Sequence, residues 1–208
     1  MIGIVDYGAG NLRSVEKALS YIGYRCEVTD NPVRLLGCDG LILPGVGAFA
    51  EAMRRLEGKD LLNPIEEFID SGRPFLGICL GLQTLMDQSE ETFDETELGI
   101  GGLGLLRGRV RRFGKGLKVP HMGWNAIELT SNTTPLFEGV ASGTYFYFVH
   151  SFYADPEDDS VVSCLSEYGH PFCAGVHRAN LNAVQFHPEK SGAAGLKVLR
   201  NFGEQVLR

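Results

Sequence analysis

The chain has 208 residues, of which 44% are hydrophobic and 22% charged, and its formal net charge is −7. This length suits a single domain over residues 1–208 that buries a substantial core. The acidic balance argues against nucleic acid or an anionic membrane surface as a partner. The longest apolar stretch, residues 75–86, is too short to span a bilayer, so we expect no membrane segment.

The five cysteines are odd in number and contain no Cys-x-x-Cys pair. This usage indicates neither a disulfide framework nor a zinc site, and it favours a reducing compartment. Asp6 interrupts the only apolar run near the N-terminus, where no basic leader is found, so we expect a cytoplasmic protein. No residue cluster indicates a metal or an organic cofactor.

The first half of the chain alternates strand and helix patterns. Expected strands are 2–6, 26–29, 39–43 and the run 74–76, and expected helices open at Asn11 as N-cap and cover 49–56 and 61–69. Such alternation predicts an α/β fold with an open, mostly parallel central sheet and helices on both faces.

The second half changes to short strand patterns. These are residues 109–113, 125–129, 145–153, 161–167 and 172–177, and a last helix opens near Ser191. We expect them to form an antiparallel extension of the sheet in the C-terminal half, or an antiparallel flap beside it. Between the halves, the acidic residues 90–97 are typical of a solvated loop.

Cys79 lies in the sequence Gly77-Ile78-Cys79-Leu80-Gly81, after an apolar run and before a helical stretch. This is the nucleophile-elbow pattern with Cys in place of Ser, in which a tight turn pushes the side chain clear of the backbone. The first N–H groups of the following helix are expected to favour the thiolate. A buried cysteine between packing glycines would fit the pentapeptide equally well.

His187 and Glu189 favour the catalytic interpretation. They flank Pro188 after an expected strand at 183–186, and residues two apart in an extended segment face the same side. A thiol nucleophile, an imidazole base and a carboxylate that orients it form a triad. Alone, His-Pro-Glu is more often an ordinary turn; with the cysteine elbow it predicts a catalytic pair.

Gly45 and Gly47 follow the expected strand at 39–43, in the sequence Pro44-Gly45-Val46-Gly47. Glycines at a strand end let the backbone approach a substrate and aim amides at it. We therefore expect the amides of Val46 and Leu80 to hold the oxyanion of a tetrahedral intermediate. An ordinary strand-to-helix turn is the alternative.

The strand, oxyanion loop, cysteine elbow and His-x-Glu, in this order, resemble the class I (triad) glutamine amidotransferases over essentially the whole chain. The segments 5–12, 120–125, 147–152 and 186–191 are similar to those of glutaminase subunits of imidazole glycerol phosphate synthase, in histidine biosynthesis. The resemblance implies L-glutamine as substrate and Cys79, His187 and Glu189 as catalytic residues. It also implies substrate-binding residues, which are Gly47, Gln83, Ser151 and Phe152.

The resemblance further implies a partner. This is a (β/α)₈-barrel cyclase subunit that receives the ammonia in a heterodimer. The predicted docking face carries Asn11, His121, Trp124 and Lys190, and tryptophan is a residue type enriched at interfaces.

Three alternatives stay open at this point. The chain could serve another synthase, such as that of anthranilate or pyridoxal phosphate. It could be a free-standing cysteine hydrolase of γ-glutamyl or peptide bonds, which needs no partner. A catalytically silent binding subunit is the third alternative, and the intact triad weighs against it.

Overall fold

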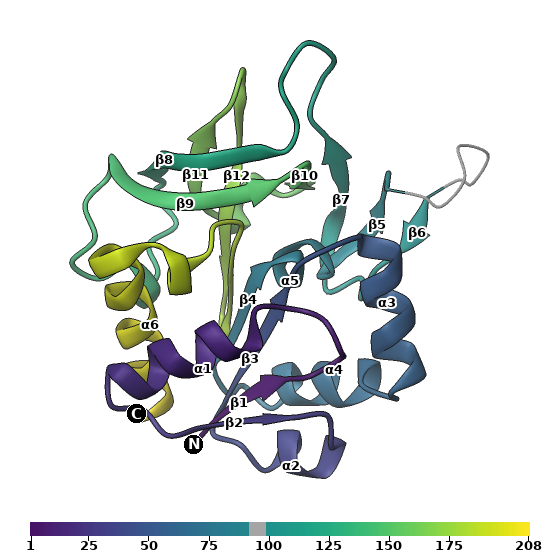
Figure 1. Ribbon diagram of the computed structural model, residues 1–208, viewed down its shortest axis with the longest axis vertical. Coiled ribbons are helices and arrows are strands. Elements are labelled where there is room, and N and C mark those ends of the chain that lie inside the picture. Colours follow the sequence, from purple (N-terminus) through teal and green to yellow (C-terminus); the bar gives the residue numbers. More distant parts are fainter. Residues whose placement is uncertain (92–98) are drawn as a thin grey trace.

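The computed structural model describes residues 1–91 and 99–208 (Figure 1). The larger sheet of the described residues has nine strands in the order β2-β1-β3-β4-β13-β12-β11-β8-β9. Most of the expected acidic loop, residues 92–97, lies outside the described residues. Glu90 and Glu91 are described, and Glu91 is half-buried instead of solvated.

The parallel part of this sheet brings the N-terminal strands beside one strand from the end of the chain. Each neighbouring pair from β2 to β13 is parallel. The strands are β2 (Cys26–Thr29), β1 (Ile2–Val5), β3 (Gly40–Gly45), β4 (Phe75–Cys79) and β13 (Leu181–Val184). The carboxyl ends of β3, β4 and β13 therefore meet at one sheet edge, where a substrate site of an α/β sheet is expected.

The remaining strands extend the sheet in antiparallel pairs. They are β12 (Pro171–Arg178), β11 (Val162–Glu167), β8 (His121–Leu129) and β9 (Thr144–His150). The predicted fold class, a mostly parallel sheet with an antiparallel C-terminal extension, is confirmed. The segment 120–125, which has no plain strand pattern, nevertheless begins β8 at His121.

A second sheet stands beside the first, where the sequence left open an antiparallel flap (Figure 1). Its strands, in spatial order, are β10 (Phe152–Pro156), β7 (Leu106–Arg112), β5 (Met86–Ser89) and β6 (Ile100–Gly101). The strand expected over 145–153 is therefore divided: β9 belongs to the large sheet and β10 to the small one. Ser151 is the residue between these two strands, where the chain passes from one sheet to the other.

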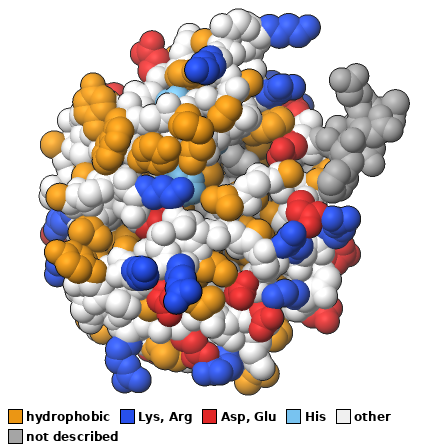
Figure 2. Space-filling model, viewed as in Figure 1, with side chains coloured by type: hydrophobic (Ala, Val, Ile, Leu, Met, Phe, Trp, Pro, Cys, Tyr) orange, Lys and Arg blue, Asp and Glu red, His pale blue; other side chains and the backbone are white. Residues whose placement is uncertain are grey.

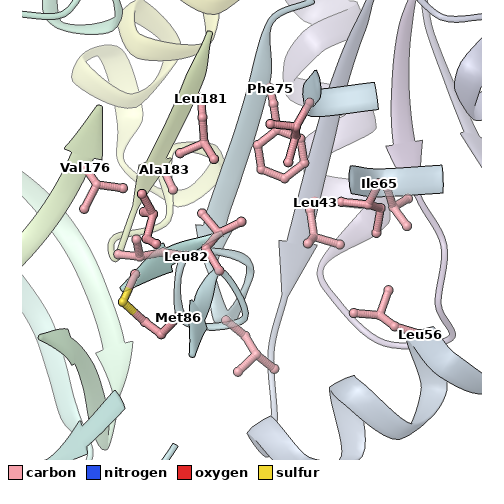
Figure 3. Close-up of a cluster of buried hydrophobic side chains, with 14 of the residues drawn as sticks. Leu43, Leu56, Ile65, Phe75, Leu82, Met86, Val176, Leu181 and Ala183 are labelled. Carbon is pink, nitrogen blue, oxygen red and sulfur yellow. The ribbon is translucent and has the colours of Figure 1, made fainter. Parts of the chain in front are cut away.

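Helices cover both faces of the large sheet. Leu41 and Leu43 of β3 pack in the cluster of α2 (Pro32–Leu36), α3 (Phe49–Gly58) and α4 (Leu62–Asp70). Figure 3 shows Leu43, Ile65 and Phe75 in this cluster. Between those two leucines, Ile42 joins the opposite cluster, against α1 (Leu12–Tyr21) and α6 (Gly192–Val206). Side chains that alternate along one strand thus pack into two hydrophobic cores, one on each face of the sheet.

In residues 1–91 and 99–208, no helix combines the length and apolar content needed to cross a membrane.

Candidate active site

Cys79 ends β4 and has a left-handed backbone conformation, with φ 55° and ψ −104°. A non-glycine residue at positive φ is strained, and such strain is typical of a nucleophile elbow. The turn fits only because a glycine follows it: a Cβ on Gly81 would lie 1.9 Å from the backbone oxygen of Leu43. The sharp turn leaves the sulfur of Cys79 at the carboxyl edge of the parallel strands.

The helix after the elbow, α5 (Leu80–Gln83), has only four residues. The macrodipole that the sequence suggested as a thiolate stabiliser is therefore much smaller than that of a full helix. A side-chain donor is present instead, because Nε2 of Gln185 lies 3.5 Å from Sγ of Cys79. Gln185 was not predicted as a site residue.

His187 and Glu189 meet in the structure by a route that differs from the predicted one. The strand β13 ends at Val184, and Pro188–Lys190 forms a turn of 3₁₀ helix, so the pair does not lie in an extended segment. The tight turn still brings Nδ1 of His187 to 2.9 Å from Oε1 of Glu189. Both side chains are almost fully buried, at 1% and 0% exposure.

The charges around His187 determine its protonation. Burial of the imidazole lowers its pKa, but the interactions with Cys79 and with the Glu189 carboxylate outweigh this and raise the pKa to about 10. For Glu189, burial raises the pKa, and the hydrogen bonds from His187 and Asn11 outweigh it, so the pKa lies below its usual value. An imidazolium between a sulfur and a carboxylate is the result.

The outer nitrogen of the imidazole is free for chemistry. Among the described residues, Nε2 of His187 has no acceptor in hydrogen-bond geometry, although it is buried. The Cys79 sulfur therefore acts on His187 chiefly through its charge. This nitrogen is the atom that can exchange a proton with a molecule bound over Cys79.

Asn11 contacts the triad directly. It occupies the N-cap position of α1 as predicted, but its side chain makes no capping hydrogen bond. Instead, Nδ2 donates to Oε1 of Glu189 at 3.0 Å, the same oxygen that accepts from His187. A residue predicted for the docking face thus also supports the catalytic carboxylate.

A pocket of about 260 Å³ opens beside Cys79. It is small compared with roughly 300–1,000 Å³ for drug-sized ligands, and it suits an amino acid. All the residues predicted to bind the oxyanion or the substrate line it: Val46, Gly47, Leu80, Gln83, Ser151 and Phe152. The lining residues that sequence reasoning missed are Glu91, Pro120, Val149 and His150.

Gln83 is held by the protein in a defined orientation. Its Nε2 donates to the backbone oxygen of Phe152 at 2.8 Å and to Oε1 of Gln185 at 3.2 Å. Both hydrogens of the amide are therefore used, and Oε1 is the atom left for a ligand. Gln83 presents an acceptor to the pocket.

Glu91 adds a carboxylate to the pocket wall. Its Oε2 accepts the backbone N–H of Phe49 at 2.7 Å. Burial raises the pKa of this carboxyl, and the hydrogen bond from Phe49 opposes that effect. Within a run of acidic residues, no sequence signal distinguished this position from its neighbours.

Strands β8 and β9 present hydrophobic side chains to solvent, as Figure 2 shows on the face turned to the viewer. Met122, Trp124 and Tyr145 are 62%, 55% and 60% exposed. Nearby, Nζ of the exposed Lys190 lies 6.0 Å from the ring centre of Tyr147. Exposed apolar side chains that gather in this way are typical of an interaction surface.

His121, which the sequence placed on the docking face, is a buried residue. Its imidazole is only 5% exposed and points into the protein. Residues three apart in a strand point to opposite faces of the sheet. Because the side chain of Trp124 points to solvent, that of His121 in the same strand points into the protein. The side chain of His121 is therefore not exposed beside Trp124, and its place on the docking face stays a prediction.

Among the described residues, no group of three or more His, Cys, Asp or Glu side chains is arranged to hold a metal ion.

A cysteine on a strained elbow, a buried His–Glu pair and a small pocket at the carboxyl edge of the sheet match the arrangement of a nucleophile, base and carboxylate triad. The family model described as glutamine amidotransferase class-I matches residues 3–206. The chain belongs to the class-I glutamine amidotransferase family. Solved structures agree on the fold: one titled a glutamine amidotransferase superimposes with a TM-score of 0.74 at 20% identity, over 100% of this chain and 99% of that one.

Curated members of this family are similar to the chain over nearly its whole length. It is 52% identical to the imidazole glycerol phosphate synthase subunit HisH of Desulfitobacterium hafniense strain DSM 10664 / DCB-2, over 99% of this chain and 95% of the relative. The HisH subunit of Methanocaldococcus jannaschii is 47% identical over 98% of this chain and 99% of its own length. The similarity thus covers whole chains.

Proposed function

We propose that the chain is the glutaminase subunit of an imidazole glycerol phosphate synthase, in histidine biosynthesis. It hydrolyses L-glutamine to glutamate and ammonia and passes the ammonia to a cyclase partner. The partner makes imidazole glycerol phosphate and an aminoimidazole carboxamide ribonucleotide. The observation that carries the glutaminase activity is the buried His187–Glu189 pair beside Cys79. The identity to HisH subunits over whole chains supports this synthase.

In the first step, the thiolate of Cys79 adds to the γ-carboxamide carbon of glutamine. The carbonyl electrons move onto oxygen, and the amides of Val46 and Leu80 donate hydrogen bonds to that oxyanion. The imidazolium of His187 gives its Nε2 proton to the amide nitrogen as the C–N bond breaks. Ammonia leaves, and a glutamyl thioester remains on Cys79.

In the second step, neutral His187 takes one proton from water as the water oxygen attacks the thioester carbon. Collapse of the intermediate breaks the C–S bond and releases the thiolate and the γ-carboxylic acid, which loses its proton to solvent to give glutamate, while His187 keeps the first proton. Glu189 keeps Nδ1 protonated throughout, so that Nε2 faces the reacting atoms. The thiolate–imidazolium pair is thereby restored.

Binding of glutamine uses the rest of the pocket. We assign the backbone of Gly47, Ser151 and Phe152 and the Oε1 of Gln83 to the substrate. The carboxylate of Glu91 lies on the same wall and suits the α-ammonium group of an amino acid. The carboxylate of Glu91 and the small volume of the pocket together favour a small zwitterionic amino acid as the ligand.

The partner is a (β/α)₈-barrel cyclase in a heterodimer. The supporting observation is the exposed apolar surface of β8 and β9 with Trp124, next to Lys190 and Asn11. Ammonia released into water becomes ammonium, a poor nucleophile, so a receiving subunit against the site is the economical arrangement. We further propose that residues 1–208 act as one domain, because both hydrophobic clusters share the same sheet. The free cysteines support a cytoplasmic location.

The test is glutamate release from glutamine in three mixtures. These are the chain alone, the chain with a cyclase barrel, and both with the nucleotide substrate. We expect release that requires the barrel and nucleotide and that disappears in Cys79→Ala. Robust release without the barrel would favour a free-standing hydrolase, and stimulation by an anthranilate or pyridoxal phosphate synthase partner instead would assign the chain to that complex.

A further inference from the structure

Two buried histidines next to the pocket have no part in the triad. His150 ends β9 and lines the pocket, and its Nδ1 lies 2.8 Å from the backbone oxygen of Phe152. Its Nε2 lies 3.2 Å from Nδ1 of His121, which begins β8. The ring of His121 stacks on Phe148 and Tyr168, with centroids 5.2 and 4.2 Å away. The two rings therefore connect strand β8 to the pocket wall.

The backbone oxygen of Phe152 determines which ring nitrogen of each histidine carries the hydrogen. A carbonyl oxygen can only accept, so Nδ1 of His150 carries the hydrogen and Nε2 is the acceptor. Nδ1 of His121 must then donate, which leaves its Nε2 to accept from Nδ2 of Asn125 at 3.3 Å. Burial lowers the pKa of His150 to about 3 and of His121 to about 4, so both rings are neutral, as this arrangement requires.

On the pocket side, the same connection reaches the nucleophile. The oxygen of Phe152 accepts from both His150 and Gln83. Gln83 also donates to Oε1 of Gln185, whose Nε2 faces the sulfur of Cys79. A continuous series of hydrogen bonds thus joins β8 to Cys79, and its direction reverses at the oxygen of Phe152, which accepts from both sides.

The location of this series gives it a role. Phe152 begins β10 in the small sheet, whereas His150 ends β9 in the large one, and the chain changes sheets at Ser151. The small sheet holds one side of this division, because Phe152 pairs with Arg112 of β7 and the N–H of Phe113 donates to the oxygen of Ser151 at 3.3 Å. The bond from His150 to Phe152 spans the division, because it joins the residues on either side of Ser151.

We propose that His121 and His150 are positioning residues that fix the Ser151–Phe152 backbone, and with it the acceptor of Gln83, in the geometry that binds glutamine. This rests on the proposed function of the pocket. His121 sets the tautomer of His150, and His150 holds the Phe152 carbonyl. Without the donor from His121, the imidazole of His150 is free to take the other tautomer, which turns a lone pair toward that carbonyl.

The variants follow from the geometry. His121→Phe keeps a ring to stack on Phe148 and Tyr168 but removes the donor. His121→Asn places an amide N–H where Nδ1 stands, so it retains the donor. His170→Phe is the matched control: His121 and His170 both pack on Phe113, with ring centroids 6.1 and 5.8 Å away, but Nδ1 of His170 bonds to the oxygen of Pro171, away from the pocket.

Two measurements separate positioning from simple stability. In the complex with the cyclase subunit, KM for glutamine and kcat are compared among these variants. On a Cys79→Ala background, calorimetry gives the dissociation constant for glutamine without turnover. We expect His121→Phe to raise KM and the dissociation constant roughly fivefold or more, as for one lost hydrogen bond, with kcat within about twofold. His121→Asn and His170→Phe should stay near the unsubstituted protein.

Equal constants for His121→Phe and His170→Phe would overturn the inference, and so would a failure of His121→Asn to restore binding. If His121→Phe does not fold, His121→Gln serves, because its longer amide misses the Nδ1 position while it keeps the polarity. If glutamine is neither bound nor turned over by the unsubstituted site, the proposed function fails and the inference with it.

Discussion

Cys79 and Glu189 hold His187 between them, and their effect on its pKa is the main chemical feature of the site at the scale of single residues. The folded pKa of about 10 lies above the ordinary value of 6.5. The imidazolium therefore contributes stability that is fully present below about pH 6.5 and is lost as the pH rises through about 10. At neutral pH the proton needed by the leaving nitrogen is already in place.

The first prediction concerns this proton. NMR of the His187 ring should show imidazolium at pH 7 to 9 and titration near 10. In Cys79→Ala, the pKa should fall by roughly 1–3 units, because the negative sulfur is the largest influence that raises it. The same pKa in both proteins would mean that Cys79 carries no charge that His187 senses.

The second prediction concerns Asn11. Asn11→Leu preserves the size of the side chain but removes the hydrogen bond to Glu189, so the pKa of that carboxyl should rise. Loss of a hydrogen bond to a charged group is worth about 1.5–3 kcal/mol, so glutaminase kcat should drop roughly tenfold or more. Affinity for the cyclase subunit, measured in parallel, is the control. A variant that loses activity only in proportion to lost partner binding would assign Asn11 to the interface alone.

Structural elements decide which parts of the site the sequence could predict. The elbow and the Pro-Gly-Val-Gly loop are local patterns, and they lie beside the pocket as expected. The contacts of Gln185, His150 and Asn11 join residues far apart in the chain, and no local pattern carries that information. Position in the fold, not residue type, distinguishes them.

Two elements differ from what the sequence predicts for them. The mixture of Pro, Met, Gly and Trp at 120–125 does not have the pattern of a strand. The sequence therefore did not predict that side chains alternate there between the two faces of a sheet, which is what turns His121 inward. Likewise, the turn after Pro188 is helical, yet it delivers the same His–Glu contact that an extended segment was expected to make. The spacing of two residues was informative, although the inferred geometry was wrong.

The third prediction tests the packing of the elbow. Gly81→Ala should destabilise the protein by about 3 kcal/mol, because its Cβ would lie 1.9 Å from the oxygen of Leu43. Gly58→Ala, also at a helical glycine but with no atom within 4 Å, should instead stabilise it by about 0.5–1 kcal/mol. Urea denaturation measures both. Equal stabilities would show that the elbow can relax away from β3.

The fourth prediction concerns strands β8 and β9, which carry the two neutral histidines. Their folded pKa values, about 4 and 3, lie below 6.5, so the unfolded chain binds protons that the folded one does not. Stability should decline as the pH falls from about 6.5 toward 3, and His121→Phe should reduce that slope by at most about 1.4 kcal/mol per pH unit. Parallel slopes for the two proteins would contradict a neutral, buried His121.

For the whole molecule, the arrangement of sheets places the reacting sulfur close to the exposed apolar surface. His187 is tied to β9, because its N–H donates to the oxygen of Tyr147 and Ser191 Oγ accepts from the N–H of Tyr147. The neighbouring Tyr145 and Trp124 belong to the exposed surface of β8 and β9. A subunit that binds there contacts strands to which the triad is directly hydrogen-bonded.

The central claim is that ammonia made at Cys79 passes to the partner without release. The most direct measurement supplies the complex with glutamine labelled with heavy nitrogen in its amide, in excess unlabelled ammonium. The account predicts that the imidazole product of the intact complex carries the label, and that Cys79→Ala yields only unlabelled product. Dilution of the label by the ammonium in the intact complex would contradict it.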